Sequence, residues 1–254
     1  MSLAKNGLNG AIPESLFATL TNLTYVDLSY NTISGTVSSN VGNARNLEWI
    51  SLSNNKLSGT IPSEIDGIGS FLVFQDSIDA AVVERGLTHL DFSHNNLSGT
   101  VPTDIGELAH LKMVDLSHNP LLGDNVVNLS ASPGSPHYRG LPEEIGNLVN
   151  LETLRLDYSA FGGFIPTQLG ALGKLRYLFA RGTGHPNYDA RNHFSGSLPT
   201  QLGNLRSLHT FRAPHNRLSG TLPVSLKGMR TLRHFDVQAP AVYDSTCTVH
   251  AAYV

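Results

Sequence analysis

The sequence contains a single cysteine, Cys247, so an internal disulfide is excluded. No apolar run reaches the ~18 residues that a membrane-spanning helix needs, and no basic and apolar leader opens the chain. Charged residues make up only 15% of the chain, and no dense basic stripe with interleaved aromatic residues is present. We therefore expect neither a nucleic-acid partner nor membrane contact by this segment itself.

The chain also lacks the motifs of common catalytic sites: a Gly-rich phosphate loop, HExxH and a paired-cysteine zinc pattern. One stretch does bring together Asp91, Ser93, His94 and Ser98, which are the side-chain types of a hydrolase triad. Triad residues normally converge from distant parts of a chain, whereas these are neighbours, and related phrases recur elsewhere. We therefore predict that the protein is not an enzyme and needs no cofactor.

A repeated phrase organises nearly the whole chain. It reads VDLSYNTISGTV from Val26, ISLSNNKLSGTIP from Ile50, LDFSHNNLSGTVP from Leu90 and FRAPHNRLSGTLP from Phe211. Equivalent asparagines lie 24 residues apart at Asn31 and Asn55, at Asn95 and Asn119, and at Asn192 and Asn216. Other intervals are longer, so three segments are inserted near residues 71–86, 124–139 and 182–190.

These residues resemble the plant-type leucine-rich repeat family, with its pattern LxxLxxLxLxxNxLSGxIPxxLGxL. The resemblance covers residues 1–237, in about nine repeats of 24 residues, and leaves 238–254 as an irregular tail. It implies an α/β solenoid, a right-handed superhelix curved like a horseshoe with a parallel β-sheet on its concave face. One departure is Ser159, which stands where other repeats have asparagine.

The repeat positions have physical explanations. Apolar pairs such as Val26 and Leu28 alternate with polar residues, so each pair should anchor a short strand with its apolar side inward. A buried asparagine where the chain leaves the strand can satisfy backbone groups that the turn leaves unpaired. The segment from Pro102 to Leu108, and its equivalents, should form short helical or irregular returns on the convex side.

The outward positions of the predicted strands are the candidate binding surface, because a solenoid presents rows of side chains on a rigid scaffold. One column runs Tyr25, Trp49, His89, Met113, Thr153, Tyr177, Thr210, His234, and the next runs Asp27, Ser51, Asp91, Asp115, Arg155, Phe179, Arg212, Asp236. Aromatic residues and arginines dominate interface energies. The candidate partner-binding residues are Tyr25, Asp27, Trp49, His89, Asp91, Met113, Asp115, Arg155, Tyr177, Phe179, Arg181 and Arg212. Ordinary exposed strand residues without a role remain the alternative.

Charge is unevenly distributed. Residues 1–127 carry a balance of −8, and residues 128–254 carry +5. Either this is a solvated surface without a role, or the strand face is complementary to a dipolar or partly anionic partner.

His94 and His118 occupy equivalent places in successive repeats, so their side chains could lie about 5 Å apart. With Asp91 and Asp115 they could hold a metal ion. However, Tyr30, Asn54 and Tyr158 fill the same column, so the position tolerates polar side chains generally, and we predict no metal site.

The three insertions allow three interpretations: functional loops, neutral insertions or unspliced sequence. Three N-x-Ser/Thr sequons, at Asn22, Asn96 and Asn128, are candidate glycosylation sites and are compatible with secretion. The chain opens inside a repeat, so we expect Met1 to begin a fragment or a gene sequence without its leader and cap.

The resemblance implies a non-catalytic recognition module for a protein or peptide ligand, with glycans and co-receptors as further candidate partners. We expect a fragment of a cell-surface receptor ectodomain, extracellular or at the cell surface; a cytoplasmic location is the alternative. A secreted inhibitor of cell-wall-degrading enzymes is the alternative function. A third hypothesis, an ice-binding surface, rests on hydroxyl residues that follow glycines, such as Thr36 and Thr60.

Overall fold

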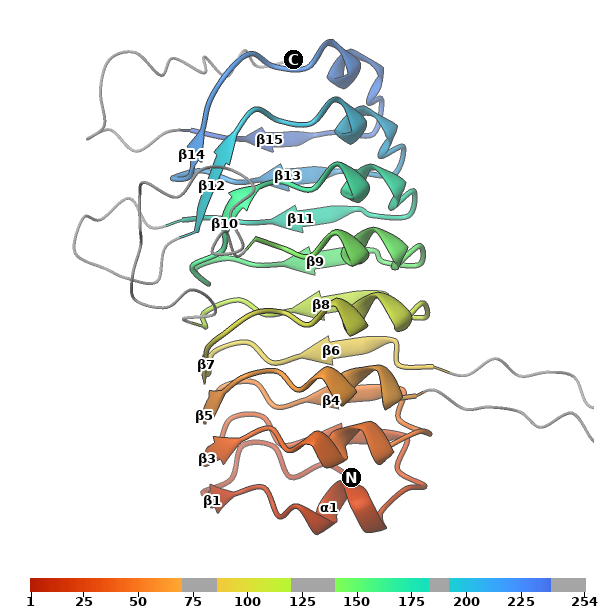
Figure 1. Ribbon diagram of the computed structural model, residues 1–254, viewed down its shortest axis with the longest axis vertical. Helices are drawn as coiled ribbons and strands as arrows, with labels where there is room; N and C mark the ends of the chain where they lie inside the picture. Colours follow the sequence, from red (N-terminus) through yellow and green to blue (C-terminus); the bar gives the residue numbers. More distant parts are fainter. Residues whose placement is uncertain (70–85, 120–139, 183–191, 239–254) are drawn as a thin grey trace, which may run out of the picture.

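The computed structural model describes residues 1–69, 86–119, 140–182 and 192–238. The chain winds as a stack of similar rungs, each with an inner strand, a turn and a short helical return (Figure 1). The insertions predicted near residues 71–86, 124–139 and 182–190 fall almost wholly outside the described residues, as does the tail. This architecture confirms the predicted solenoid.

The inner strands form one eight-stranded parallel sheet, in which each strand pairs with those of the neighbouring rungs. An isolated parallel bridge between Ser2 and Asp27 adds a partial ninth rung. The strands are β2 (Tyr25–Asp27), β4 (Trp49–Ser51), β6 (His89–Asp91), β8 (Met113–Asp115), β9 (Thr153–Arg155), β11 (Tyr177–Phe179), β13 (Thr210–Arg212) and β15 (His234–Asp236).

Two smaller parallel sheets follow the turns. The first contains β1 (Asn9–Ala11), β3 (Thr32–Thr36), β5 (Lys56–Gly59) and β7 (Asn96–Leu97), and the second contains β10 (Gly162–Phe164), β12 (His193–Gly196) and β14 (Arg217–Leu218). We refer to them together as the outer sheets.

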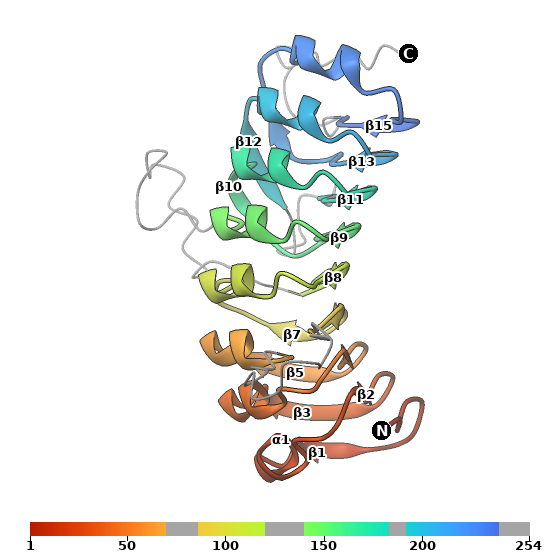
Figure 2. The same ribbon diagram turned by 90° about the vertical axis from the view of Figure 1, so that its right-hand side faces the viewer.

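The return segments lie opposite the inner sheet (Figure 2), as predicted. After α1 (Ser15–Thr19) they are 3₁₀-helices: η1 (Ser39–Asn43), η2 (Ser63–Gly67), η3 (Thr103–Glu107), η4 (Glu143–Asn147), η5 (Thr167–Ala171), η6 (Thr200–Asn204) and η7 (Val224–Gly228). A proline directly precedes six of the seven 3₁₀-helices, where its fixed φ suits the helix entry; Ser38 precedes η1 and accepts a hydrogen bond from the Asn40 backbone instead.

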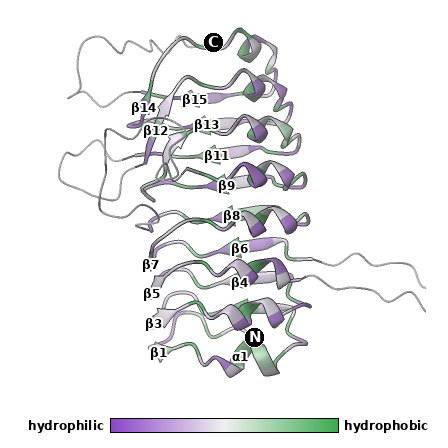
Figure 3. Cartoon of the chain, in the orientation of Figure 1, coloured by the Kyte–Doolittle hydropathy of each residue, from purple (hydrophilic) through white to green (hydrophobic). Residues whose placement is uncertain are grey.

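The core is a continuous stack of apolar side chains between the inner sheet and the 3₁₀-helices. Val26, Ile50, Leu90 and Leu154 are fully buried at the centres of their strands. Hydrophobic and hydrophilic residues alternate along the rungs in Figure 3. Each rung buries its apolar residues against the next rung, so the scaffold beneath the inner sheet is rigid.

The asparagines form the predicted ladder. Asn95 donates from Nδ2 to the carbonyls of Leu52 and Phe92, and its Oδ1 accepts from the Leu57 N–H. The side chains of Asn31, Asn55, Asn119, Asn192 and Asn216 make equivalent bonds. In the rung without asparagine, the Ser159 hydroxyl donates to Leu116 O at 2.8 Å. The ladder therefore holds the turn that leads away from the inner sheet.

Candidate functional site

The inner sheet brings the two predicted columns of outward side chains into register. Tyr25 pairs with Trp49, Trp49 with His89 and His89 with Met113, and the column continues through Thr153, Tyr177, Thr210 and His234. The second column continues from Asp27 to Asp236 in the same order as predicted. Parallel strands lie about 4.8 Å apart, so successive members of each column are close enough to interact.

Three rings stack at the N-terminal end of the first column. The ring centroids of Tyr25 and Trp49 are 5.8 Å apart, and those of Trp49 and His89 are 4.0 Å apart. The Thr88 hydroxyl donates to Glu48 O, so the 2.8 Å bond between Thr88 Oγ1 and His89 Nδ1 requires the imidazole to donate. Burial lowers the pKa of His89, which favours the neutral ring in this stack.

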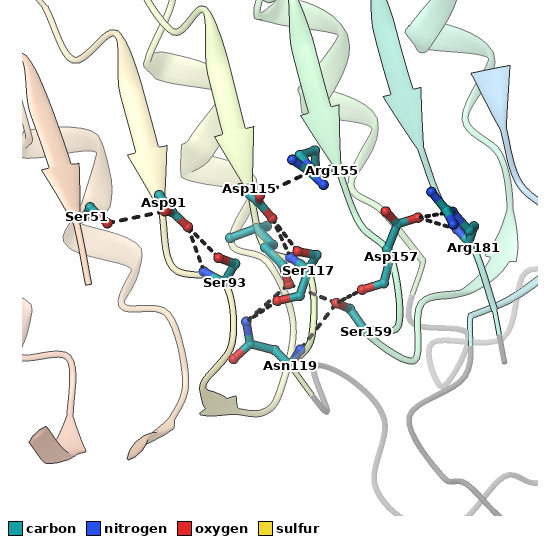
Figure 4. A network of polar contacts seen from close by, with 11 residues as sticks. Ser51, Asp91, Ser93, Asp115, Ser117, Asn119, Arg155, Asp157, Ser159 and Arg181 are labelled. Atoms are coloured by element: carbon teal, nitrogen blue, oxygen red, sulfur yellow. Dashed lines mark hydrogen bonds and ion pairs between the residues drawn. The ribbon is translucent and has the colours of Figure 1, made fainter. Parts of the chain in front are cut away.

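The acidic residues of the second column are held by serines two residues later. Asp91 Oδ1 accepts from the backbone N–H of Ser93 at 3.0 Å and from its hydroxyl at 2.7 Å. Asp115 and Ser117 repeat the arrangement, and both pairs are shown in Figure 4. Asp27 and Ser29 repeat it again. Each carboxylate is thereby oriented so that its other oxygen, Oδ2, is left for a neighbour or a ligand.

Two arginines on the following rungs pair with carboxylates. Arg155 Nε lies 3.4 Å from Asp115 Oδ2, and Arg181 Nε lies 3.8 Å from Asp157 Oδ1 (Figure 4). Burial raises the pKa of Asp115 above its ordinary range, although the bonds from Ser117 and the charge of Arg155 act in the opposite direction. Burial likewise raises the pKa of Asp157, against a backbone bond from Arg181. Sequence reasoning missed the role of Asp157, because no other rung has a carboxylate at that position.

A row of polar side chains follows the strand ends, at residues with left-handed backbone conformation. His94 and His118 have φ of 53° and 56°, and their rings stack with centroids 4.0 Å apart. Tyr158 continues the row, 4.8 Å from His118. Histidine and asparagine are enriched at such φ values, which explains why the same position also accepts Asn54.

A polar hollow of about 320 Å³ lies between the second column and this row. Serine hydroxyls (Ser51, Ser53, Ser93 and Ser117) line it together with the carboxylates of Asp91 and Asp115. The rest of its wall is formed by Ser29, Tyr30, Asn54, His94, His118 and Arg155. The hollow exists because the serine side chains are small. The charged groups around it offer both hydrogen-bond donors and hydrogen-bond acceptors.

The hollow unites three of the twelve predicted binding residues: Asp91, Asp115 and Arg155. Tyr25, Trp49 and His89 form the ring stack, and Met113 follows them in the same column. Asp27 accepts a bond from the Tyr25 hydroxyl. The other four lie on later rungs: Tyr177 and Phe179 with ring centroids 6.4 Å apart, Arg181 beside Asp157, and Arg212 next to Phe179 in register.

The structure does not assemble a nucleophilic site from Asp91, Ser93, His94 and Ser98. The Ser93 hydroxyl is bonded to Asp91, and the Ser98 hydroxyl points to Gly59 O at 3.5 Å. His94 stacks on His118 instead of accepting from a serine. Within the described ranges, no group of three or more His, Cys, Asp or Glu residues is placed to hold a metal ion.

Of the three predicted glycosylation sites, Asn22 and Asn96 are exposed, and Asn128 lies outside the described residues. A search of the described part of the chain finds no helix long and apolar enough to cross a membrane.

Comparison with protein families identifies the class of the chain. The family named Leucine Rich Repeat matches residues 46–68 and 86–108, and a second Leucine Rich repeat family matches residues 19–36. With the fold and the asparagine ladder, these matches identify the chain as a leucine-rich-repeat protein. The comparison with curated proteins gave no match.

The chain is similar to solved structures of plant receptor ectodomains. The ectodomain of the Arabidopsis thaliana membrane receptor kinase GASSHO1/SCHENGEN3, in complex with CASPARIAN STRIP INTEGRITY FACTOR 2, is 31% identical over 92% of this chain, with a TM-score of 0.73. The Arabidopsis receptor kinase HAESA, in complex with the peptide hormone IDA and the co-receptor SERK1, is 25% identical over 93% of this chain, with a TM-score of 0.60. This chain spans 23% and 41% of those two chains.

A plant ice-binding protein has the same fold, with a TM-score of 0.54. It is 20% identical over 99% of this chain and 84% of its own, a likeness that shows the fold alone.

Proposed function

We propose that this chain is a non-catalytic recognition module whose inner sheet binds an extended protein or peptide segment. The observation that carries the proposal is the polar hollow lined by Asp91, Asp115 and Arg155, set beside the stacked rings of Trp49 and His89 on one rigid sheet. Aromatic residues and arginine are enriched at interface centres, and polar groups line the rim. The similarity to ectodomains crystallised with peptide ligands supports the same use of the fold.

The residues divide into two roles. The edges of the aromatic stack and the rings of Tyr177 and Phe179 offer apolar contact area. The hydroxyls and carboxylates of the hollow offer hydrogen bonds to a ligand's backbone amides or to a basic side chain. Because the serines already orient the carboxylates, little side-chain entropy is lost when a ligand binds.

The test selects extended peptides from a displayed random library on the immobilised chain and measures their binding to two triple variants. Trp49→Ala/Tyr177→Ala/Arg212→Ala changes the inner sheet, and Phe164→Ala/Leu222→Ala/Arg217→Ala removes two apolar side chains and one cation elsewhere. We expect the first variant to weaken binding about 100-fold, which corresponds to the loss of a few interface anchors. The second variant should bind as the unaltered chain does.

Equal binding by both variants would overturn the assignment to the inner sheet. Circular dichroism of each variant separates loss of contact from loss of folding. Arg212→Ala alone serves as a second probe, because its side chain is half-buried and takes no part in the stack of Tyr25, Trp49 and His89.

We further propose that the chain belongs to the extracellular part of a cell-surface receptor. The similarity to receptor kinase ectodomains supports this location. The full-length transcript tests it, because a downstream membrane span is required. A transcript that encodes a secreted protein without such a span would favour the enzyme-inhibitor alternative instead.

A further inference from the structure

The positive charge of the C-terminal half does not lie mainly on the strand face, where the sequence suggests it. On the inner sheet, Arg155 and Arg181 are held by Asp115 and Asp157, so much of their charge is compensated. Arg212, on the same sheet, forms no ion pair with a carboxylate of the described residues, and further unpaired positive charge lies on another surface.

That surface is the edge at which β11, β13 and β15 begin (the right-hand edge of the upper rungs in Figure 1). Arg176, His209 and Arg233 directly precede the three strands and are stacked by backbone bonds: His209 N–H donates to Arg176 O, and Arg233 N–H donates to His209 O. Arg206 and Arg230 form a second row three residues earlier. We call Arg176, Arg206, His209, Arg230 and Arg233 the basic edge.

The arginines of the basic edge are exposed. No ion pair joins any of them to a carboxylate within the described residues. Residues 166–182 and 192–238 contain nine Lys and Arg residues but a single carboxylate, Asp236, at the opposite end of β15. Glu152 precedes β9 and marks the N-terminal limit of the edge.

The arrangement is regular and stiff. Rungs are about 4.8 Å apart, so the row from Arg176 to Arg233 extends for roughly 10 Å in line with the solenoid axis. The Arg176 guanidinium carbon lies 5.6 Å from the Tyr177 ring centroid, which directs that side chain. The Thr231 hydroxyl donates to Arg206 O at 2.9 Å, which ties the segment after Arg230 to the backbone of Arg206 on the preceding rung.

We propose that the basic edge binds a linear anionic polysaccharide whose carboxylates or sulfates repeat along the chain. This site is separate from the inner sheet and does not depend on the function proposed there. An acidic protein surface fits less well, because protein interfaces have an aromatic or apolar centre. Within the described residues, none of the exposed large apolar side chains lies in the segments 173–176, 206–209 and 230–233 that carry the basic edge. Binding to exposed cations alone depends on charge and is screened by salt.

The test uses three probes, polygalacturonate, dextran sulfate and polyglutamate, with neutral dextran as a blank. Binding to the intact chain is measured by biolayer interferometry at about 50 mM and about 300 mM NaCl, since the Debye length shortens strongly over that range. We expect one or both anionic polysaccharides to bind at low salt and to dissociate at high salt. Polyglutamate should bind more weakly than the polysaccharide.

Two variants with the same change in net charge locate the site. Arg176→Gln/Arg206→Gln/Arg230→Gln/Arg233→Gln removes the basic edge, and Lys5→Gln/Arg45→Gln/Lys56→Gln/Arg217→Gln removes four cations elsewhere. The first should weaken polysaccharide binding about tenfold or more, because locally focused charge is lost, and the second by less than about threefold. All eight side chains are exposed, so both variants should fold.

Three results would overturn the proposal. Equal weakening by both variants would show attraction to net charge without a site. Absence of binding to either polysaccharide at low salt would show that the basic edge is not a polysaccharide-binding site. Tighter binding of polyglutamate than of the polysaccharides would assign the edge to an acidic protein. The inner-sheet variant Trp49→Ala/Arg212→Ala leaves Tyr177 in place beside Arg176 and His209. It should retain most polysaccharide binding, which separates this result from the fate of the proposed function.

Discussion

Asn119 holds the turn of the preceding rung through Leu97, whose backbone N–H donates to Asn119 Oδ1 at 3.1 Å. The same side chain donates from Nδ2 to Phe92 O at 2.9 Å and to Leu116 O at 3.1 Å. Asn119 is fully buried, so water cannot replace these bonds when the amide is removed. One side chain thus joins two rungs at the point where the chain leaves the inner sheet.

Asn119→Ala should lower the free energy of unfolding by about 2–4 kcal/mol, because several buried backbone groups lose their partners. Urea denaturation followed by circular dichroism measures the change. Asn96→Ala is the matched control, since Asn96 is exposed, and it should change stability by less than about 0.5 kcal/mol. A loss of similar size in both variants would contradict the structural role given to the ladder.

Gly59 combines a left-handed φ of 76° with a close contact across rungs. A Cβ atom at this position would lie 2.8 Å from Thr36 Cγ2, whereas one on Gly10, with φ of 80°, would meet nothing within 4 Å. Gly10→Ala should cost about 1–2 kcal/mol for the backbone alone, and Gly59→Ala should cost more. Thr36→Ser removes the methyl group and should recover part of the additional loss. A double-mutant cycle in urea measures that coupling, and a coupling of zero would exclude the contact.

The sequence predicts the two columns of the inner sheet because a fixed period places equivalent residues in register. Trp49 and His89 are 40 residues apart, yet the repeat assigns them to one column, and the structure stacks them. The asparagine ladder is predictable for the same reason. Each of these features depends on the position within the repeat and not on the particular rung.

Features that belong to one rung could not be predicted in this way. The pairing of Arg181 with Asp157 depends on a carboxylate that no other repeat has there. The hollow depends on the small volume of Ser51, which stands in a column where the adjacent rungs carry Asp27 and Asp91. The left-handed φ of His94 does recur, at Asn54 and His118, and Asn54 is the sequence signal that could have indicated it.

Asp115→Asn should change how stability depends on pH. Burial raises the pKa of Asp115 in the folded chain above its ordinary value of 3.8, so the folded state binds a proton more readily than the unfolded state. This group therefore stabilises the fold at pH values below 3.8 and loses that contribution as pH rises through the folded pKa. The unaltered chain should gain stability relative to Asp115→Asn as the pH is lowered from 7 toward 4. Denaturation midpoints across that range measure the difference, and a constant difference would contradict the raised pKa.

Asn22 and Asn96 should carry glycans when the chain is secreted from a eukaryotic cell. Both side chains are exposed and each begins an N-x-Ser/Thr sequence. Intact-mass measurement before and after enzymatic deglycosylation detects occupancy, and Asn96→Gln should remove one glycan mass. Ser98→Ala provides an independent check, because it destroys the same sequon without changing the asparagine. A mass that neither substitution alters would show that Asn96 is unmodified.

The stacked pair His94 and His118 should make the fold sensitive to mild acid. Burial lowers the pKa of His118, and the charges of His94 and Arg155 act in the same direction. A lowered pKa means that the unfolded state binds the proton more readily, so this contribution to stability is present above the ordinary value of 6.5 and is lost as pH falls through the folded pKa.

His94→Asn/His118→Asn should remove most of this sensitivity, since Asn54 shows that the left-handed position accepts asparagine. Relative to the variant, the unaltered chain should lose less than about 1 kcal/mol between pH 7 and pH 5, because both rings are partly exposed and solvent screens their charges. Urea midpoints at the two pH values measure the effect. His89→Asn is the matched comparison, because burial also lowers the pKa of His89. This variant should lose less stability between pH 7 and pH 5 than the unaltered chain. The loss that His94→Asn/His118→Asn removes should still be present in it. If the His94→Asn/His118→Asn variant retains the full pH dependence, the stacked pair is not its origin.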